Sequence, residues 1–369
     1  MTNEEKKQFI INAHKLYMEH RPYDGCSSIN EMKAKEDAFW SIYASSFYHL
    51  LPKSLFKYRK PTEDAIKCLK NDEAWFSHPA DFDDTVDSVI NNDIESELEE
   101  FEKHPEVVTM KLAKAFVGAF AASKGITINE KQIEECLPLF DENGTFNEED
   151  TKQYLLSKMP EYATDECVSK LKENTSTVVN DKVLESVKGF LTYYVDLNKR
   201  TRSETLVYSL AEEGDNQAMW GLYADESKGF CIEYEFPKET FLGQRMLLNL
   251  FPIYYGEKPL IKFFDVLIKG LYAKNQVNGI SYEDYQDWFL SAYTKDKTYE
   301  FQKEWRITFD KRMGGNLQQF PFAKSIILGE RISEEYRERL IDIAKKKNIR
   351  VYIRKVNKTG SKITVERLF

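Results

Sequence analysis

The sequence predicts an α+β fold with a mixed, largely antiparallel central sheet, a flanking pair of N-terminal helices and a helical insertion. Three observations lead to this class. Segments at both ends of the chain alternate apolar and polar residues, as half-buried strands do: residues 54–59, 230–236 and 303–309. Stretches with apolar residues every three or four positions are typical of amphipathic helices. A nearly continuous helical pattern follows an acidic run and extends to about residue 198.

These patterns divide the chain into three parts. Residues 1–50 are expected to form N-terminal helices, at 3–20 and 30–50, that pack on the core. Residues 51–105 and 200–369 are expected to form a discontinuous α/β core domain, and residues 106–199 a helical insertion. The clearest helical spacing in the insertion belongs to Met110, Leu112, Ala115, Phe116, Ala119 and Phe120.

The core domain is expected to contain strands from both ends of the chain that meet in one sheet. A strand at 54–59 leads to a helix at 62–69, which Thr62 caps, and then to a strand at 73–79. Further strands are predicted at 204–210, 230–236, 246–256, 303–309, 325–329 and 349–356. Further helices are predicted at 259–275, 281–293 and 333–347.

The segment 219–236 joins a helical pattern to a strand. Trp220 and Tyr223 lie three residues apart and share a face if the segment is helical. Lys228 and Gly229 are expected to form the turn, because glycine accepts the positive φ that a tight reversal requires. In the strand, alternate residues from Phe230 to Phe236 are apolar and face one side.

Charge is distributed unevenly along the chain. The net charge is −9, yet residues 302–369 contain 17 Lys and Arg against 8 Asp and Glu. A basic face can attract the phosphates of a nucleotide or a nucleic acid. A solvated helix face with alternating charges explains the same pattern, and the overall acidity argues against tight non-specific binding of nucleic acid.

The cysteines and the N-terminus indicate a cytoplasmic protein. The five cysteines have no CxxC spacing, so free thiols in a reducing cytoplasm are expected rather than disulfides or a zinc site. The N-terminal residues lack the apolar stretch of a signal peptide, and no run is long enough to span a membrane. We therefore expect neither secretion nor a membrane partner.

The first candidate site lies on the strand 303–309. Its period places Glu304, Arg306 and Thr308 on one face and Trp305 on the other. A carboxylate and a guanidinium on one face can bind a sugar hydroxyl and an anion together. A salt-bridged face in contact with solvent is the alternative.

A second candidate pair, Lys57 and Arg59, lies on one face of the strand 54–59 and is suited to a diphosphate. Ser77 and His78, at the end of the strand 73–79, are expected to line the same cleft. Alternatively, Arg59 neutralises the acidic run that begins at residue 81.

The aspartates at 81, 83, 84 and 87 could supply oxygen ligands to a hard cation. They lack the spacing of a calcium loop, so helix caps and solvated turns explain them better, and no metal is expected. The sequence has no P-loop, GxGxxG, GxSxG or HExxH motif. A thiol nucleophile is not indicated either, because the acids on the face of Cys231 would raise the pKa of its thiol.

Five short motifs occur in a recognisable order: LFKYR at 55–59, WFSHPADFDD at 75–84, MWGLYADESKGFCIEYEF at 219–236, KEWRITF at 303–309 and KSIILGERI at 324–332. Together they resemble the bacterial domain-of-unknown-function family twenty-nine seventy-one. The likeness covers about residues 50–105 and 200–355.

This layout is similar to that of distant ADP-ribosyltransferases, especially toxins that modify nucleic acids and their relatives in abortive infection. The resemblance implies that NAD is the substrate, held by Lys57 or Arg59. It implies that Tyr223 stacks on nicotinamide and that Glu304 is the catalytic carboxylate. Ser77, Trp220 and Arg306 complete the expected NAD site. Tyr58 stands where those enzymes have their first histidine.

Three functions follow as hypotheses. The first is a cytoplasmic bacterial effector or phage-defence protein that transfers ADP-ribose from NAD to a nucleic-acid or protein acceptor. The second is a non-catalytic protein that senses a nucleotide or another small-molecule ligand in the same cleft. The third is a metal-dependent nuclease that uses the acids near Asp83.

Overall fold

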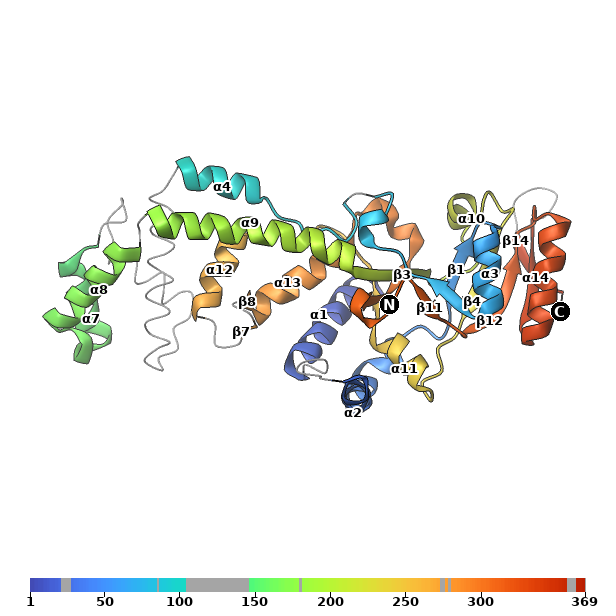
Figure 1. The fold of residues 1–369 in the computed structure, drawn as a ribbon, viewed down its shortest axis with the longest axis horizontal. Helices are drawn as coiled ribbons and strands as arrows, with labels where there is room; N and C mark the ends of the chain where they lie inside the picture. The colour runs from blue at the N-terminus through green and yellow to red at the C-terminus, as the bar shows by residue number, and fades with distance from the viewer. Residues whose placement is uncertain are drawn as a thin grey trace. The chain divides into compact units, whose positions relative to one another are not determined.

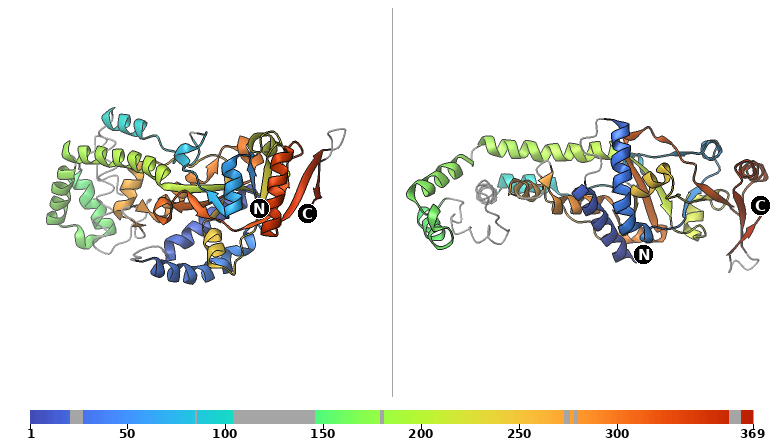
Figure 2. Two further views of the ribbon diagram at one scale, coloured as in Figure 1. Left: turned by 45° about the vertical axis from the view of Figure 1, so that its right-hand side comes forward. Right: turned by 90° about the horizontal axis from the view of Figure 1, so that it is seen from below.

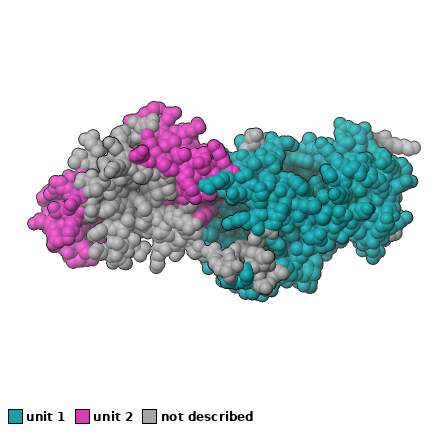
Figure 3. Space-filling model, in the orientation of Figure 1, with its two compact units in different colours: residues 1–89, 200–258, 289–369 teal, residues 90–199, 259–288 magenta. Residues whose placement is uncertain are grey.

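The structure is a computed structural model that describes residues 1–20, 28–84, 86–103, 146–178, 181–272, 276–277, 280–356 and 363–368. Two compact units make up the chain (Figure 3). Unit 1 consists of residues 1–89, 200–258 and 289–369, and unit 2 of residues 90–199 and 259–288. The helix predicted around Met110 lies outside the described residues.

An eight-stranded sheet forms the centre of unit 1 (Figure 1), with the strand order β14-β13-β12-β4-β1-β3-β10-β5. Only β12 and β13 are parallel neighbours, so the predicted α+β class with a mixed, largely antiparallel sheet is confirmed. The strands are β1 (Leu55–Arg59), β3 (Thr205–Ala211), β4 (Phe230–Tyr234), β5 (Leu250–Pro252), β10 (Glu304–Asp310), β12 (Ala323–Leu328), β13 (Arg350–Val356) and β14 (Ile363–Arg367).

Smaller strand pairs complete unit 1. They are β2 (Glu73–Trp75) with β11 (Leu317–Gln319), and β6 (Tyr254–Tyr255) with β9 (Thr294–Lys295). The helices that belong wholly to unit 1 are α1 (Asn3–His20), α2 (Ile29–Phe47), α3 (Glu63–Asn71), α10 (Gln217–Tyr223), α11 (Phe241–Leu248) and α14 (Glu334–Lys347). Thr62 caps α3 as predicted, since its hydroxyl accepts a hydrogen bond from the Ala65 amide.

One face of the sheet carries the main hydrophobic core. Helices α1 and α2 bring aromatic side chains onto β10, where the ring of Phe9 lies 5.9 Å from that of Trp305. Helices α3 and α14 cover the same core through Leu69 and Leu340. The C-terminal helix, red in Figure 2, contacts the strands β12 and β13 that flank it in the sequence.

The opposite face of the sheet is covered by α10. Trp220 is fully buried there with Tyr58 and Cys231. Alternation in β4 is therefore confirmed, because Phe230, Ile232 and Tyr234 face the main core while Cys231 faces α10. Burial, and secondarily Glu233, raises the pKa of the Cys231 thiol, as the sequence indicated.

Two local predictions were wrong. Residues 246–248 belong to α11 rather than to a strand, and pairing with β10 begins only at Leu250. In the turn before β4 the positive φ angles belong to Asp225, Glu226 and Ser227, not to Gly229. Gly229 is required for a different reason: a Cβ atom there would lie 2.1 Å from the carbonyl oxygen of Arg59 on the neighbouring strand.

Unit 2 is mainly helical. Its helices include α4 (Ile94–Lys103), α7 (Glu148–Lys158), α8 (Asp165–Val178) and α12 (Phe263–Tyr272), while α9 (Asp181–Glu204) and α13 (Tyr282–Ala292) continue into unit 1. Two short strands, β7 (Gln276–Val277) and β8 (Ile280–Ser281), pair beside α12. The Glu97 carboxylate caps α12 by accepting hydrogen bonds from the amides of Phe263 and Phe264.

Candidate functional site

A cavity of about 440 Å³ lies within unit 1, on the face of the sheet opposite to the main core. Strands β10, β3 and β1 form its floor, and α10 with the 3-10 turn Lys297–Gln302 forms one wall. Another wall is the acidic segment, which we define as residues 79–84 and 86–89. The acidic segment contributes Asp81, Phe82, Asp83, Asp84 and Asp87 to the lining.

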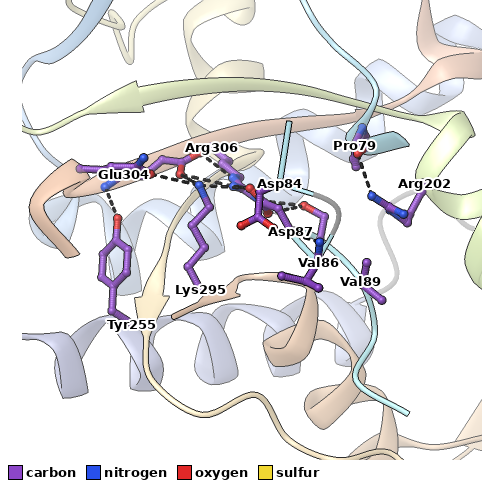
Figure 4. Close-up of polar contacts among 12 residues, drawn as sticks. Pro79, Asp84, Val86, Asp87, Val89, Arg202, Tyr255, Lys295, Glu304 and Arg306 are labelled. Carbon is purple, nitrogen blue, oxygen red and sulfur yellow. Dashed lines mark hydrogen bonds and ion pairs between the residues drawn. The ribbon is translucent and has the colours of Figure 1, made fainter. Parts of the chain in front are cut away.

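Four charged side chains meet at the floor of this cavity (Figure 4): Asp87, Lys295, Glu304 and Arg306, which we call the charged quartet. Arg306 binds Asp87 with two parallel hydrogen bonds, each of 2.7 Å, and donates from Nε to Glu304 Oε1 at 2.7 Å. Lys295 Nζ lies 2.6 Å from Glu304 Oε2 and 3.1 Å from Asp87 Oδ2. Two cations thus neutralise two carboxylates.

The position of Glu304 and Arg306 follows from the strand pattern. In β10 these residues pair with Ala211 and Ser209 of β3, so their side chains share one face, as predicted. The intervening Trp305 points into the main core and is buried. The main chain at Glu304 is fixed as well, because its amide donates to the hydroxyl of Tyr255 at 2.8 Å (Figure 4).

Both carboxylates of the quartet are ionised. Burial acts to raise the pKa of Glu304, but ion pairs with Arg306 and Lys295 outweigh burial and hold that pKa well below its usual range. The same balance of burial against Arg306 lowers the pKa of Asp87. Glu304 therefore acts in this site as a fixed negative charge and hydrogen-bond acceptor.

Gln302 connects the quartet to the aromatic wall. Its carbonyl oxygen accepts a hydrogen bond from Lys295, and its amide donates to the hydroxyl of Tyr223 at 2.7 Å. Burial raises the pKa of Tyr223, so this phenol stays neutral at ordinary pH. The ring of Tyr299 lies under Lys295, with 5.5 Å between the ammonium and the ring centre.

The floor of the cavity contains a gap between two strands. β1 and β3 pair only at Phe56 and Ala211 and then diverge. In the gap, the Lys57 ammonium donates to the Ser209 carbonyl at 2.7 Å, which supplies the hydrogen bond that a neighbouring strand would otherwise make. Within the part of the chain that the structure describes, Lys57 forms no ion pair within 4.0 Å. Burial, followed by the charge of Arg59, lowers its pKa to about 7 against the weaker attraction of Glu304.

Four of the seven predicted site residues line the cavity: Lys57, Tyr223, Glu304 and Arg306. The other three do not. Arg59 packs over Tyr208 at 5.8 Å, toward the main core. Ser77 pairs through its backbone with Val207, where β1 has diverged from β3. Trp220 is buried, and its indole donates to the Gly214 carbonyl at 3.0 Å.

Three residues of the site were not assigned to it from the sequence: Asp87, Lys295 and Gln302. From the sequence, Asp87 fits a helix cap, a solvated turn or a ligand of a hard cation, because nothing local connects it to a strand more than 200 residues away. Lys295 lies beside Asp296 and Lys297, where alternating charges are typical of a solvated turn. The KEWRITF motif begins one residue after Gln302 and is the sequence feature that could have indicated that Gln302 belongs to the site.

Other predicted features can be placed in the described residues. His78 contacts the Thr205 carbonyl through Nδ1 at 2.9 Å. Among the residues with described positions, no three His, Cys, Asp or Glu side chains are grouped so that they could hold a metal ion. A helix with the length and apolar character needed to cross a membrane is likewise not found there.

Comparison with known proteins gave one match. Residues 219–307 match the model of a family described as a protein of unknown function (DUF2971). No curated protein and no solved structure matched the chain significantly. The matched segment includes Tyr223, Gln302, Glu304 and Arg306, and hence part of the cavity lining. Over this segment the match supports the predicted resemblance to that family.

Proposed function

We propose that the cavity of unit 1 binds NAD and that the protein transfers ADP-ribose to an acceptor. The observation that supports this most is the ionised Glu304 carboxylate at the floor of an aromatic-lined cavity. The volume of about 440 Å³ is within the usual range for small-molecule sites.

The chemistry requires a negative charge near the ribose. When the bond between the nicotinamide nitrogen and the ribosyl carbon breaks, its electron pair leaves with nicotinamide and positive charge develops on the sugar. The Glu304 carboxylate would stabilise that charge, and the acceptor nucleophile would then form the new bond to the same carbon and lose its proton. The exposed side of the Tyr223 ring would stack on the leaving nicotinamide.

A specific observation favours a second candidate, a non-catalytic site that senses a nucleotide. Both oxygens of Glu304 are held by cations, at 2.7 Å from Arg306 and 2.6 Å from Lys295. A carboxylate paired in this way stabilises an adjacent cation less than a free one does. For both candidates we propose a cytoplasmic bacterial protein, an effector or phage-defence factor in the case of the transferase.

Nicotinamide release from NAD, measured with purified protein and cell lysate, tests the proposal. Glu304→Gln should lower turnover by about 10²- to 10³-fold, as loss of one electrostatic stabiliser does. Glu300→Gln is the matched control, because Glu300 lies four residues away and is exposed. Circular dichroism must show that both variants are folded.

The outcome separates the two candidates. Release that depends on Glu304 and is unchanged in Glu300→Gln supports the transferase. Thermal stabilisation by NAD without release supports the sensor, since a ligand that binds the folded state alone raises its stability. Neither release nor stabilisation would refute NAD as the ligand of this cavity.

A further inference from the structure

We propose that Arg306 forms an anion subsite that Asp87 occupies in this structure, and that a phosphate group of the ligand displaces Asp87 from it. This inference concerns the same cavity as the proposed function, and it rests on that function in no other respect. It explains why a site expected to receive a phosphate-bearing ligand is lined by so many acids.

The geometry at Arg306 is that of anion recognition. Nη1 donates to Asp87 Oδ1 and Nη2 to Asp87 Oδ2, both at 2.7 Å. The planar fork of a guanidinium binds two oxygens of a carboxylate or two oxygens of a phosphate in the same way. Nη1 also contacts the Ser88 hydroxyl at 2.7 Å. The Asp87 carboxylate thus occupies the place that two phosphate oxygens would take.

Asp87 differs from the other quartet members in the element that carries it. Lys295, Glu304 and Arg306 belong to strands β9 and β10, whereas Asp87 belongs to an irregular part of the acidic segment. Besides Asp87, the contacts that hold this segment include single hydrogen bonds to its carbonyl oxygens, such as that from Arg202 to Pro79 at 3.0 Å (Figure 4). Ser88 has a φ of +55°, a conformation that non-glycine residues adopt at a cost.

The charges of the cavity depend on the acidic segment. The described lining residues include three cations and five carboxylates, a formal balance of −2. Four of those carboxylates, Asp81, Asp83, Asp84 and Asp87, come from the acidic segment, so the remaining lining has a balance of +2. With the segment in place the cavity repels a phosphate, and without it the cavity attracts one.

Anion binding and release of the acidic segment are therefore coupled. A phosphate cannot share the Arg306 fork with Asp87, and its charge is repelled by the three other aspartates of the segment. A ligand shifts a two-state equilibrium by its difference in affinity for the two states. Here that difference arises because the anion gains Arg306 and Lys295 only in the state that Asp87 has left.

Inorganic pyrophosphate is the probe, used with the full chain. Hydrogen exchange of the wild-type backbone amides at residues 86–89 should accelerate at least about tenfold at saturating pyrophosphate, because the segment loses its main anchor. Unchanged or slower exchange at these amides would overturn the proposal. This measurement needs no variant and so does not depend on how a variant folds.

A charge-matched pair of variants gives the second test. Asp87→Asn removes the competing carboxylate, whereas Asp83→Asn removes the same charge from the same segment without a contact to Arg306. Calorimetry should find pyrophosphate bound at least about tenfold more tightly by Asp87→Asn than by Asp83→Asn. Equal affinities in two folded variants would contradict displacement.

Failure of this inference and failure of the proposed function are distinguishable. NAD cleavage that depends on Glu304, together with unchanged exchange in pyrophosphate, refutes the inference and leaves the transferase in place. Release of the acidic segment by pyrophosphate in a protein that neither binds nor cleaves NAD supports the subsite and refutes the proposed ligand.

Discussion

Lys57→Met should stabilise the protein at neutral pH and remove a pH dependence from its stability. Lys57 is a cation in the gap between β1 and β3, and its hydrogen-bond acceptor is the neutral Ser209 carbonyl. Burial and Arg59 lower its pKa from 10.5 to about 7. Methionine fills a similar space without a charge that must be desolvated.

The sign and size of the effect follow from proton linkage. The unfolded chain keeps the Lys57 proton up to pH about 10.4, whereas the folded chain loses it above pH about 7. The unfolded state therefore binds more protons in this window, and the free energy of unfolding rises with pH. The slope is about 1.4 kcal/mol per pH unit, and the whole shift of about 3.5 units corresponds to at most about 5 kcal/mol.

Urea denaturation at pH of about 7.5, 8.5 and 9.5 measures this slope. The stability advantage of Lys57→Met over the wild type should shrink by about 1.4 kcal/mol for each pH unit, because only the wild type gains from deprotonation. Lys60→Met is the control, since Lys60 is exposed at the end of the same strand. An advantage that stays constant with pH, or grows, would refute the linkage argument.

Two further substitutions test the packing around the site. Gly229→Ala should lower the free energy of unfolding by about 1–3 kcal/mol, because the new Cβ would lie 2.1 Å from the Arg59 carbonyl oxygen. Gly315→Ala is the control and should have a much smaller effect, because a Cβ there has open space around it. Equal urea midpoints for the two variants would contradict this reasoning. Arg306→Met should lower the free energy of unfolding by about 3–5 kcal/mol, because it leaves two buried carboxylates with Lys295 as their cation. Arg312→Met removes one partner of an exposed ion pair, so its free energy of unfolding should stay within about 1 kcal/mol of the wild type. A small effect of Arg306→Met in thermal unfolding would show that the quartet is not desolvated.

The period of two in the strands was enough to predict much of the sheet. It placed Glu304 and Arg306 on one face and Trp305 in the core, and the structure confirms both faces. Alternation depends only on backbone geometry, so it can be read locally. The same reasoning was wrong for residues 246–248, where three apolar residues fit a buried helix as well as a strand.

Contacts between distant segments could not be predicted in this way. Asp87 reaches Arg306 from an irregular segment whose conformation no periodic pattern encodes. Lys57 and Arg59 share a strand face as predicted, but only Lys57 lines the cavity, because the strands diverge beside it. Trp220 and Tyr223 lie in one helix, yet one is buried and the other lines the cavity and is partly exposed.

The single residue pair between β1 and β3 also bears on how the sheet holds together. β3 forms seven pairs with β10, and β1 forms five with β4, but only Phe56 and Ala211 join the two groups of strands. The sheet therefore consists of two groups of strands, β14-β13-β12-β4-β1 and β3-β10-β5, which meet at the boundary between β1 and β3. Few ladder hydrogen bonds cross this boundary, so side-chain contacts join the two groups of strands instead, such as the hydrogen bond of Lys57 to the Ser209 carbonyl and the contact of 3.2 Å between the hydroxyls of Tyr208 and Tyr234. The cavity is lined by β1 on one side of this boundary and by β3 and β10 on the other, so a ligand that contacts all three strands would add a further link between the two groups.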